Sequence, residues 1–77
     1  MDNRIKELRN ETGVTQQELA EKVDVSSRTI ISLEKGQYNP SLLLAHKLAE
    51  YFDCAIEEVF IFSEEDGIRG DAENPEQ

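Results

Sequence analysis

The sequence predicts an all-α domain of five short helices, and three observations support that prediction. Over residues 1–62, apolar residues recur three and four positions apart, which is the spacing of one helix face. Ser and Thr residues that can cap helices stand just before three of these stretches, and glycines follow two of them. With 77 residues, the chain has room for a single small domain.

Composition sets limits on what this domain can be. The chain carries 17 acidic and 8 basic residues, so its net charge is -9, and its longest apolar runs span four residues. A membrane span needs about 20 apolar residues, and no signal peptide is visible, so we expect a cytoplasmic protein without membrane contact. The single cysteine, Cys54, excludes an internal disulfide and a cysteine-rich zinc site. We therefore expect no metal and no cofactor.

The acidity is concentrated at the C-terminal end. Residues 63–77 hold six Asp or Glu residues and one Arg, with two glycines, one proline and few apolar side chains. Such a segment cannot bury enough surface to offset the entropy lost on ordering. We predict a domain over residues 1–62 and a flexible acidic tail over residues 63–77.

The first two helices are predicted over about residues 3–12 and 16–23. The first has an apolar stripe and stops at Gly13. That stripe consists of Ile5, Leu8 and Thr12. The second begins with a capping box, in which Thr15 accepts from a free backbone N–H and Glu18 reaches back. Its apolar side consists of Leu19, Ala20 and Val23.

The third helix is predicted over about residues 27–35. Ser26 supplies its N-cap, and Lys35 followed by Gly36 suits the negative end of the helix dipole. Just three residues, 24–26, separate this helix from the one before it. So short a link forces a sharp turn, with the two helices packed across each other.

Two further helices are predicted over about residues 42–52 and 56–60. The fourth follows Asn39-Pro40-Ser41, and its expected core stripe is Leu42, Ala45, Leu48, Ala49 and Phe52. The fifth has Glu57 and Glu58 in its first turn, where the dipole favours them, but Ala55 is a poor cap. The run Val59–Phe62 is apolar and β-prone.

A helix, a tight turn and a second helix form the helix-turn-helix arrangement, whose second helix can enter the DNA major groove. In this region the sequence resembles the XRE/Cro/C1-type helix-turn-helix regulators. The stretches that carry the resemblance are Val14–Val23, Val25–Ser26, Thr29–Ile30, Leu33–Gly36 and Tyr38–Leu42. It covers about residues 3–62 and is strongest to short, dimeric members with a lone DNA-binding domain. It implies a five-helix, lambda-repressor-like fold with a short C-terminal β-strand used for dimerisation.

The resemblance also implies a DNA-binding face. The recognition helix corresponds to residues 27–35, with Ser27, Arg28 and Ser32 facing the bases, and Gln16 corresponds to a phosphate-binding residue. Arg9 and Glu34 correspond to a structural pair that ties the first helix to the third. The whole predicted face has two cations and no acid. It consists of Gln16, Gln17, Ser26, Ser27, Arg28, Thr29, Ile31, Ser32, Lys35, Gln37, Tyr38 and Asn39.

Three positions depart from the pattern of the resembled family. Asp24 stands where the turn usually has a glycine in the left-handed region, which Asp tolerates at some cost. Ile31 replaces a residue that is often polar, which favours contact with a thymine methyl group. Arg28 stands where many members have Gln, and Arg prefers guanine, so the preferred DNA sequence should differ.

The negative net charge is the main objection to DNA binding. Phosphate contacts supply much of the affinity for DNA, and a charge of -9 repels phosphates. The acids, however, fall mainly on the tail and on the first, fourth and fifth helices, and screening limits surface charge effects to about 8 Å. We expect modest non-specific affinity and a shallow salt dependence. A high-salt cytoplasm is an alternative explanation for the acidity.

The run Val59, Phe60, Ile61 and Phe62 is the predicted dimerisation segment. A strand alternates its faces, so Ile61 must point opposite to Phe60 and Phe62. A core of 62 residues cannot easily cover both faces, so one face should meet a second subunit. The resemblance implies the same two-fold dimer.

The sequence thus predicts a non-enzymatic transcriptional regulator, a repressor that binds a pseudo-palindromic DNA operator as a homodimer. A protein-interaction or antitoxin-like module that keeps the helix-turn-helix as a scaffold is the alternative, which the acidity favours. Binding to the chain's own upstream DNA would separate the two. An enzyme is disfavoured because we expect no paired carboxylates in a cleft, and the sequence has no nucleophile with a base and no glycine-rich phosphate loop. No small-molecule ligand is evident.

Overall fold

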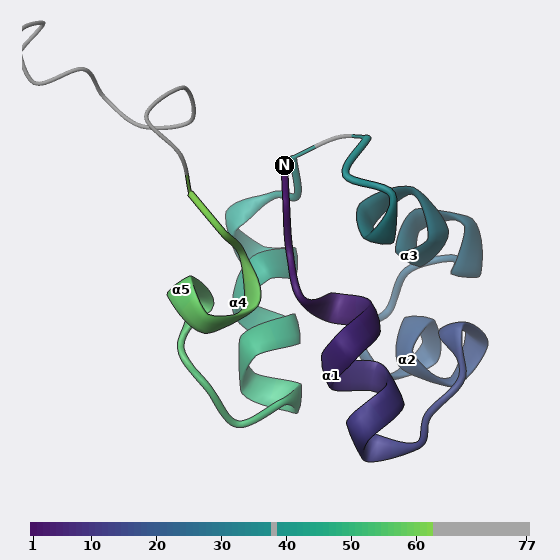
Figure 1. Cartoon of the computed structure of the whole chain (residues 1–77). Helices are drawn as coiled ribbons and strands as arrows, with labels where there is room; N and C mark the ends of the chain where they lie inside the picture. The colour runs from purple at the N-terminus through teal and green to yellow at the C-terminus, as the bar shows by residue number, and fades with distance from the viewer. Residues whose placement is uncertain (38, 63–77) are drawn as a thin grey trace, which may run out of the picture.

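Five α-helices follow one another in the computed structural model, which describes residues 1–37 and 39–62 (Figure 1). Their bounds are α1 (Ile5–Thr12), α2 (Gln16–Lys22), α3 (Ser27–Glu34), α4 (Leu42–Tyr51) and α5 (Ile56–Val59). The predicted all-α class and the order of the helices are confirmed. The expected acidic tail, residues 63–77, lies outside the described residues. Within the described ranges, no helix is long and apolar enough to cross a membrane.

The helices begin where capping side chains stand. Thr15 forms the predicted capping box with Glu18, and the Ser26 and Ser41 hydroxyls accept from the backbone N–H groups of Thr29 and Leu44. α5 lacks a capping side chain at Ala55, but the Glu58 carboxylate accepts from the Ala55 N–H at 2.7 Å. This bond explains how α5 forms behind a residue that is a poor cap.

One buried cluster holds the five helices together. It consists of Ile5, Leu19, Ala20, Val23, Ile30, Leu33, Leu44, Ala45, Leu48, Ala49, Val59 and Phe60. Two predicted core positions are wrong: Leu42 is 80% exposed, and Thr12 is exposed, with its hydroxyl donating to carbonyls of its own helix. Leu42 is the first residue of α4 and overhangs the end of the core, whereas Leu44 is buried.

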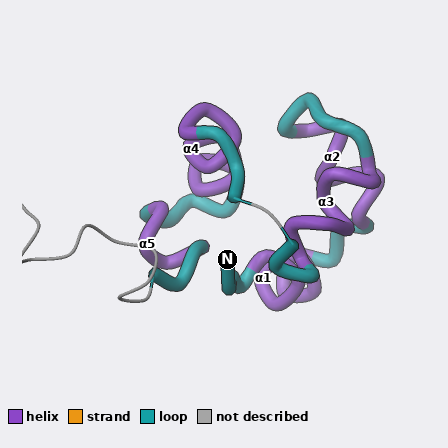
Figure 2. The backbone as a smooth tube through the Cα atoms, turned by 90° about the horizontal axis from the view of Figure 1, so that it is seen from above, coloured by secondary structure: helices purple, strands orange, loops and turns teal. Residues whose placement is uncertain are grey.

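The first helix was predicted from about residue 3, but α1 begins at Ile5 and the residues before it are not helical. α1 begins at Ile5 because the Asn3 side chain accepts from the Ile5 N–H at 3.1 Å, which stops the helix from reaching residue 3. Asn3 instead forms an antiparallel bridge with Phe60. Figure 2 shows the N-terminal segment and α1 lying between the α4–α5 pair and the α2–α3 pair.

The C-terminal β-strand is not present as such. In residues 1–37 and 39–62 the β structure is this isolated Asn3–Phe60 bridge. Val59 and Phe60, expected at a dimer interface, are instead buried in the chain's own core, because the N-terminal segment pairs with them. Ile61 and Phe62 are 48% and 52% exposed. These two side chains are the part of the predicted dimerisation segment that a partner could reach.

Candidate nucleic-acid interface

The turn between α2 and α3 sets the angle at which the two helices cross. Asp24 has φ 63°, so the left-handed conformation predicted for it is confirmed. The Val25 N–H donates to the Ala20 carbonyl at 2.9 Å, which folds the turn back on α2. Ala20 and Ile30 are both buried where the two helices meet. The pair lies at one side of the molecule, with α4 and α5 at the other (Figure 1).

α3 turns one side to the core and the other outward. Ile30 and Leu33 are fully buried. Residues at spacings of three and four occupy the opposite side. These are Ser27, Arg28, Ile31, Ser32 and Lys35, of which Ser27, Arg28 and Lys35 are exposed and Ile31 and Ser32 are half-buried. The first turn of α3 therefore presents a hydroxyl and a guanidinium to the surroundings, as a major-groove reader requires.

Neighbouring segments extend this surface, which we call the α2–α3 face. It also includes Gln16, Gln17, Ser26, Thr29, Gln37 and Asn39. Gln17, Ser26, Gln37 and Asn39 are exposed, whereas Gln16 and Thr29 are half-buried. Tyr38, which we also predicted there, lies outside the described residues. The face brings the start of α2, the outer side of α3 and the segment after α3 together.

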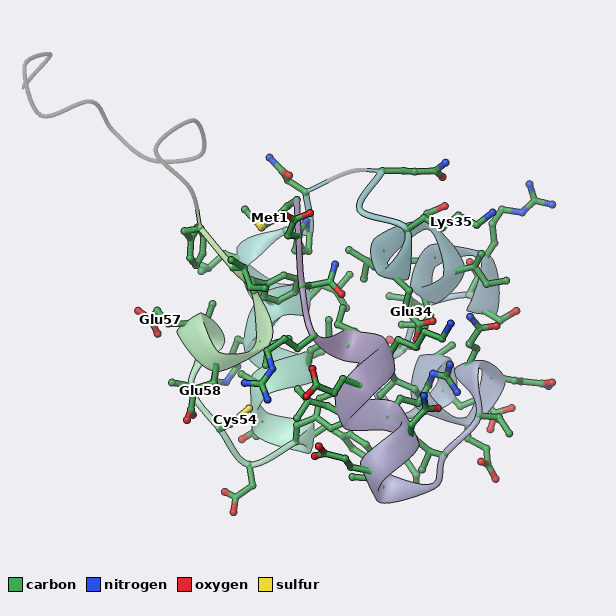
Figure 3. The ribbon with its side chains drawn as sticks, in the orientation of Figure 1. Met1, Glu34, Lys35, Cys54, Glu57 and Glu58 are labelled. Carbon is green, nitrogen blue, oxygen red and sulfur yellow. The ribbon has the colours of Figure 1, made fainter. Side chains whose placement is uncertain are left out.

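Glu34 connects three elements beneath the α2–α3 face. It points from α3 toward α1 and α2 (Figure 3). The Arg9 guanidinium donates to Glu34 through Nε at 2.7 Å, and the side chains of Arg9 and Glu34 are just 14% and 6% exposed. Arg9 also donates to the Val14 carbonyl at 3.1 Å, so it ties α1 both to α3 and to the loop before α2. This nearly buried pair holds the three helices in register.

The same carboxylate orients Gln16. The Gln16 amide nitrogen donates one N–H to Glu34 Oε1 at 3.0 Å, and its second N–H remains available for another acceptor. Gln16 is the first residue of α2, directly after the Thr15 cap, where the first backbone N–H groups of a helix have no partner within it. Side chain and helix end together suit an anion such as a phosphate.

Comparison with known proteins supports the same interpretation. Residues 5–59 match the helix-turn-helix family. The chain is 54% identical over 66 residues to an uncharacterized HTH-type transcriptional regulator of Archaeoglobus fulgidus, which covers 86% of this chain and 94% of the relative. The chain belongs to the XRE/Cro/C1-type helix-turn-helix family of transcriptional regulators.

Two further similarities place this XRE-type regulator among known relatives. The restriction-modification controller protein C.AhdI from Aeromonas hydrophila superposes with a TM-score of 0.66 at 34% identity, over 71% of this chain and 83% of that one. The cryptic phage CTXphi transcriptional repressor RstR of Vibrio cholerae is 34% identical over 80% of this chain and 56% of its own. The family is one of regulators, not of enzymes.

Charge is distributed unevenly over this XRE-type regulator. Glu57 and Glu58 lie on α5, on the side away from α3 and Lys35 (Figure 3). Shifted pKa values also occur away from the α2–α3 face. Burial raises the pKa of the Cys54 thiol, with Glu58 adding to the effect, and the hydrogen bond to Glu7 raises the pKa of Arg4. In residues 1–37 and 39–62, no group of three or more His, Cys, Asp or Glu residues could hold a metal ion.

Sequence reasoning missed one polar residue that touches the recognition helix. The Asn3 amide nitrogen donates to the Leu33 carbonyl of α3 at 2.6 Å. We had included Asn3 in the first helix of this XRE-type regulator. The available signal was the tendency of Asn to accept from a backbone N–H two residues further on, as Asn3 does from Ile5 just before α1 begins.

Proposed function

We propose that this regulator binds a pseudo-palindromic DNA operator as a homodimer and represses transcription. α3 enters the major groove, with Ser27, Arg28 and Ser32 toward the bases and Ile31 toward a thymine methyl group. Gln16, Gln17, Lys35, Tyr38 and Asn39 contact the backbone, and Ser26 and Thr29 hold the start of α3. The observation that supports the proposal most is the outer side of α3, which carries cations and hydroxyls and no acid.

A second copy of the chain is the partner that this mode of binding needs. Two recognition helices must lie about 34 Å apart to read successive major grooves. Ile61, Phe62 and Leu42 are large apolar side chains that stand exposed, and Phe62 and Leu42 line a shallow apolar pocket of about 270 Å³. Exposed apolar patches of this kind favour association. We place the dimer contact at Ile61 and Phe62.

Repression is the expected direction of control. The relative RstR is named as a repressor, and its similarity covers most of this chain. The helix-turn-helix domain, residues 5–59, accounts for most of the described residues. A bound dimer would act by occupying promoter DNA. The expected result is reduced transcription in vitro from a promoter that contains the bound site.

Selection from a random oligonucleotide pool tests the function directly. Fluorescence anisotropy then measures affinity for the selected duplex and for a shuffled duplex of equal length. We expect an inverted repeat, two chains per duplex by sedimentation, and at least about 1,000-fold preference over shuffled DNA. Equal affinity for both duplexes would leave the protein-interaction or antitoxin-like module as the function.

A further inference from the structure

Residues 2–4, which precede α1, connect the end of α3 to the segment that precedes Phe62. We propose that Asn3 is a positioning residue for DNA binding, which holds α3 at a set place relative to the dimer contact and so sets the half-site spacing that the dimer accepts. This inference rests on the proposed function. It goes beyond it by naming the residue that links the two surfaces.

On one side, the N-terminal segment is bound to the last turn of α3. The Asn3 amide nitrogen donates at 2.6 Å to the Leu33 carbonyl, which also accepts from the Gly36 N–H at 2.9 Å, so Asn3 shares an acceptor in the C-terminal turn of α3. The backbone nitrogen of Met1 lies 2.9 Å from the Gly36 carbonyl oxygen. At Gly36, with φ 73°, an added Cβ would lie 3.3 Å from the Met1 carbonyl oxygen. The segment therefore packs directly on the end of the recognition helix.

On the other side, the same residues pair with the C-terminal segment. The Arg4 N–H donates to the Val59 carbonyl at 2.7 Å, and the Ile61 N–H donates to the Asp2 carbonyl at 2.8 Å. These two bonds flank the Asn3–Phe60 bridge, so Asn3 is held from both sides. Ile61, one of the proposed dimer residues, is thus a single hydrogen bond away from the N-terminal segment.

The arrangement of the helices makes this connection important. α3 packs chiefly on α2, whereas α4 packs on α5, and the N-terminal segment lies between these two pairs (Figure 2). Through residues 2–4, the path from Ile61 to α3 crosses two hydrogen bonds and a short stretch of backbone. This path adds to the shared core and the Arg9–Glu34 pair in restricting how far each α3 can shift relative to its partner's. Because the two α3 helices are already held in place in the free protein, less entropy is lost when they bind DNA.

Two substitutions remove the Asn3 amide donor, and with it the bond to α3 and a second bond to the Met1 carbonyl at 3.1 Å. Asn3→Ser keeps a hydroxyl that can accept from the Ile5 N–H, but it is too short to reach Leu33, and Asn3→Asp keeps the acceptor and removes the donor. Leu8→Ala is the matched control. Leu8 is half-buried against the core in α1, so its truncation lowers stability while residues 2–4 remain intact.

Amide hydrogen exchange in the DNA-free protein measures the link itself. Gly36 and Gln37 donate to carbonyls of the last turn of α3. In both Asn3 variants we expect these two amides to exchange about tenfold faster than in wild type, the value of one net hydrogen bond, relative to amides in α2. In Leu8→Ala the two sets should change together. Unchanged relative exchange in the Asn3 variants would overturn the proposal.

Half-site spacing measures the consequence for DNA. The probes are the duplex selected by wild type and versions with one or two base pairs inserted between its half-sites. Wild type and Leu8→Ala should lose affinity steeply with each insertion, whereas the Asn3 variants should show a loss about tenfold smaller. Identical spacing profiles would refute the role of Asn3 and leave the proposed function standing. If wild type binds no selected duplex, the proposed function fails, and hydrogen exchange still decides whether Asn3 holds α3.

Discussion

Side chains on the α2–α3 face differ in how firmly the fold holds them. The Gln16 amide is bound to a nearly buried carboxylate, and the Ser26 and Thr29 hydroxyls lie 3.1 Å apart. Arg28, by contrast, is exposed at the start of α3. A change at Gln16 therefore disturbs both the surface and the packing beneath it. A change at Arg28 affects what α3 touches and leaves the fold intact.

Arg28→Ala should weaken binding to the selected operator by about 1–3 kcal/mol, because a bidentate contact to guanine is lost. The midpoint of thermal unfolding should stay unchanged, since the side chain is exposed. Anisotropy titrations on operator and shuffled DNA provide the measurement, with Lys35→Ala as the control for a loss shared by all sequences. An equal loss on both duplexes would assign Arg28 to phosphate contact.

Arg9→Leu should cost about 3 kcal/mol of unfolding free energy, because it leaves Glu34 nearly buried without its cation. Urea denaturation measures the loss. Arg4→Leu is the matched control, since Arg4 pairs with Glu7 at 3.3 Å with both side chains about half exposed. An exposed pair of this kind contributes little to stability, because water screens both charges. Similar losses in the two variants would contradict a structural role for the Arg9–Glu34 pair.

At the scale of the elements, the turns after α2 and α4 each contain an Asp residue with a left-handed backbone conformation. Asp24 and Asp53 have φ 63° and 56°, which is the left-handed region that side chains other than glycine enter at a cost. At Asp24 the turn fixes how α3 crosses α2. The strained residue Asp24 lies in the turn that sets the direction of α3. Replacing Asp24 with a residue that has no strain at this φ should leave that direction unchanged.

Asp24→Gly should raise the free energy of unfolding by about 0.5–1 kcal/mol, because glycine adopts this conformation without the Cβ clash. Affinity for the operator should remain within twofold of wild type. Asp24→Ala keeps the Cβ without the carboxylate and should destabilise the domain. Urea midpoints of the three proteins check the order. A less stable glycine variant would mean that the Asp24 side chain stabilises the turn in another way.

Helix boundaries show where local patterns succeed and where they fail. Thr15, Ser26 and Ser41 cap helices at the positions predicted from sequence. Leu42 has the spacing of a core residue in α4 and is exposed all the same. Periodicity identifies the side of a helix that faces the core, but it does not reveal how far the opposing helices extend.

At the scale of the whole molecule, the outer side of α3 and the helix α5 carry charges of opposite sign. The outer side of α3 has cations and no acid, while Glu57 and Glu58 lie on α5 at the opposite side (Figure 3). Ile61 and Phe62 stand exposed beyond α5. In the proposed dimer this separation keeps the carboxylates of α5 away from the duplex, whereas the exposed acids Glu18, Glu21 and Asp24 stand on α2 and its turn and should reduce the affinity at low salt.

Phe62→Asp should convert the proposed dimer to monomers without unfolding the domain, because the Phe62 side chain is 52% exposed. Burying a carboxylate at the contact of two copies would be costly. Sedimentation equilibrium checks the mass, and circular dichroism checks the fold. Leu43→Asp is the control, since Leu43 is 60% exposed but lines a different pocket, beside Val25 and Lys47. A dimer that persists in Phe62→Asp would place the contact elsewhere.

Sequence alone was sufficient for the order of the five helices, the caps of α2, α3 and α4, the left-handed turn at Asp24 and the family. Each of these depends on residues within a few positions of one another. Tertiary contacts decided the exposure of Leu42, the burial of Phe60 and the hydrogen bonds of Asn3. These properties depend on which other elements pack against each residue. Asn3 reaches α3 across thirty positions of sequence, and Phe60 is buried because the first residues of the chain return to pair with it. No local pattern encodes such contacts, since their partners are brought together by the packing of the whole chain.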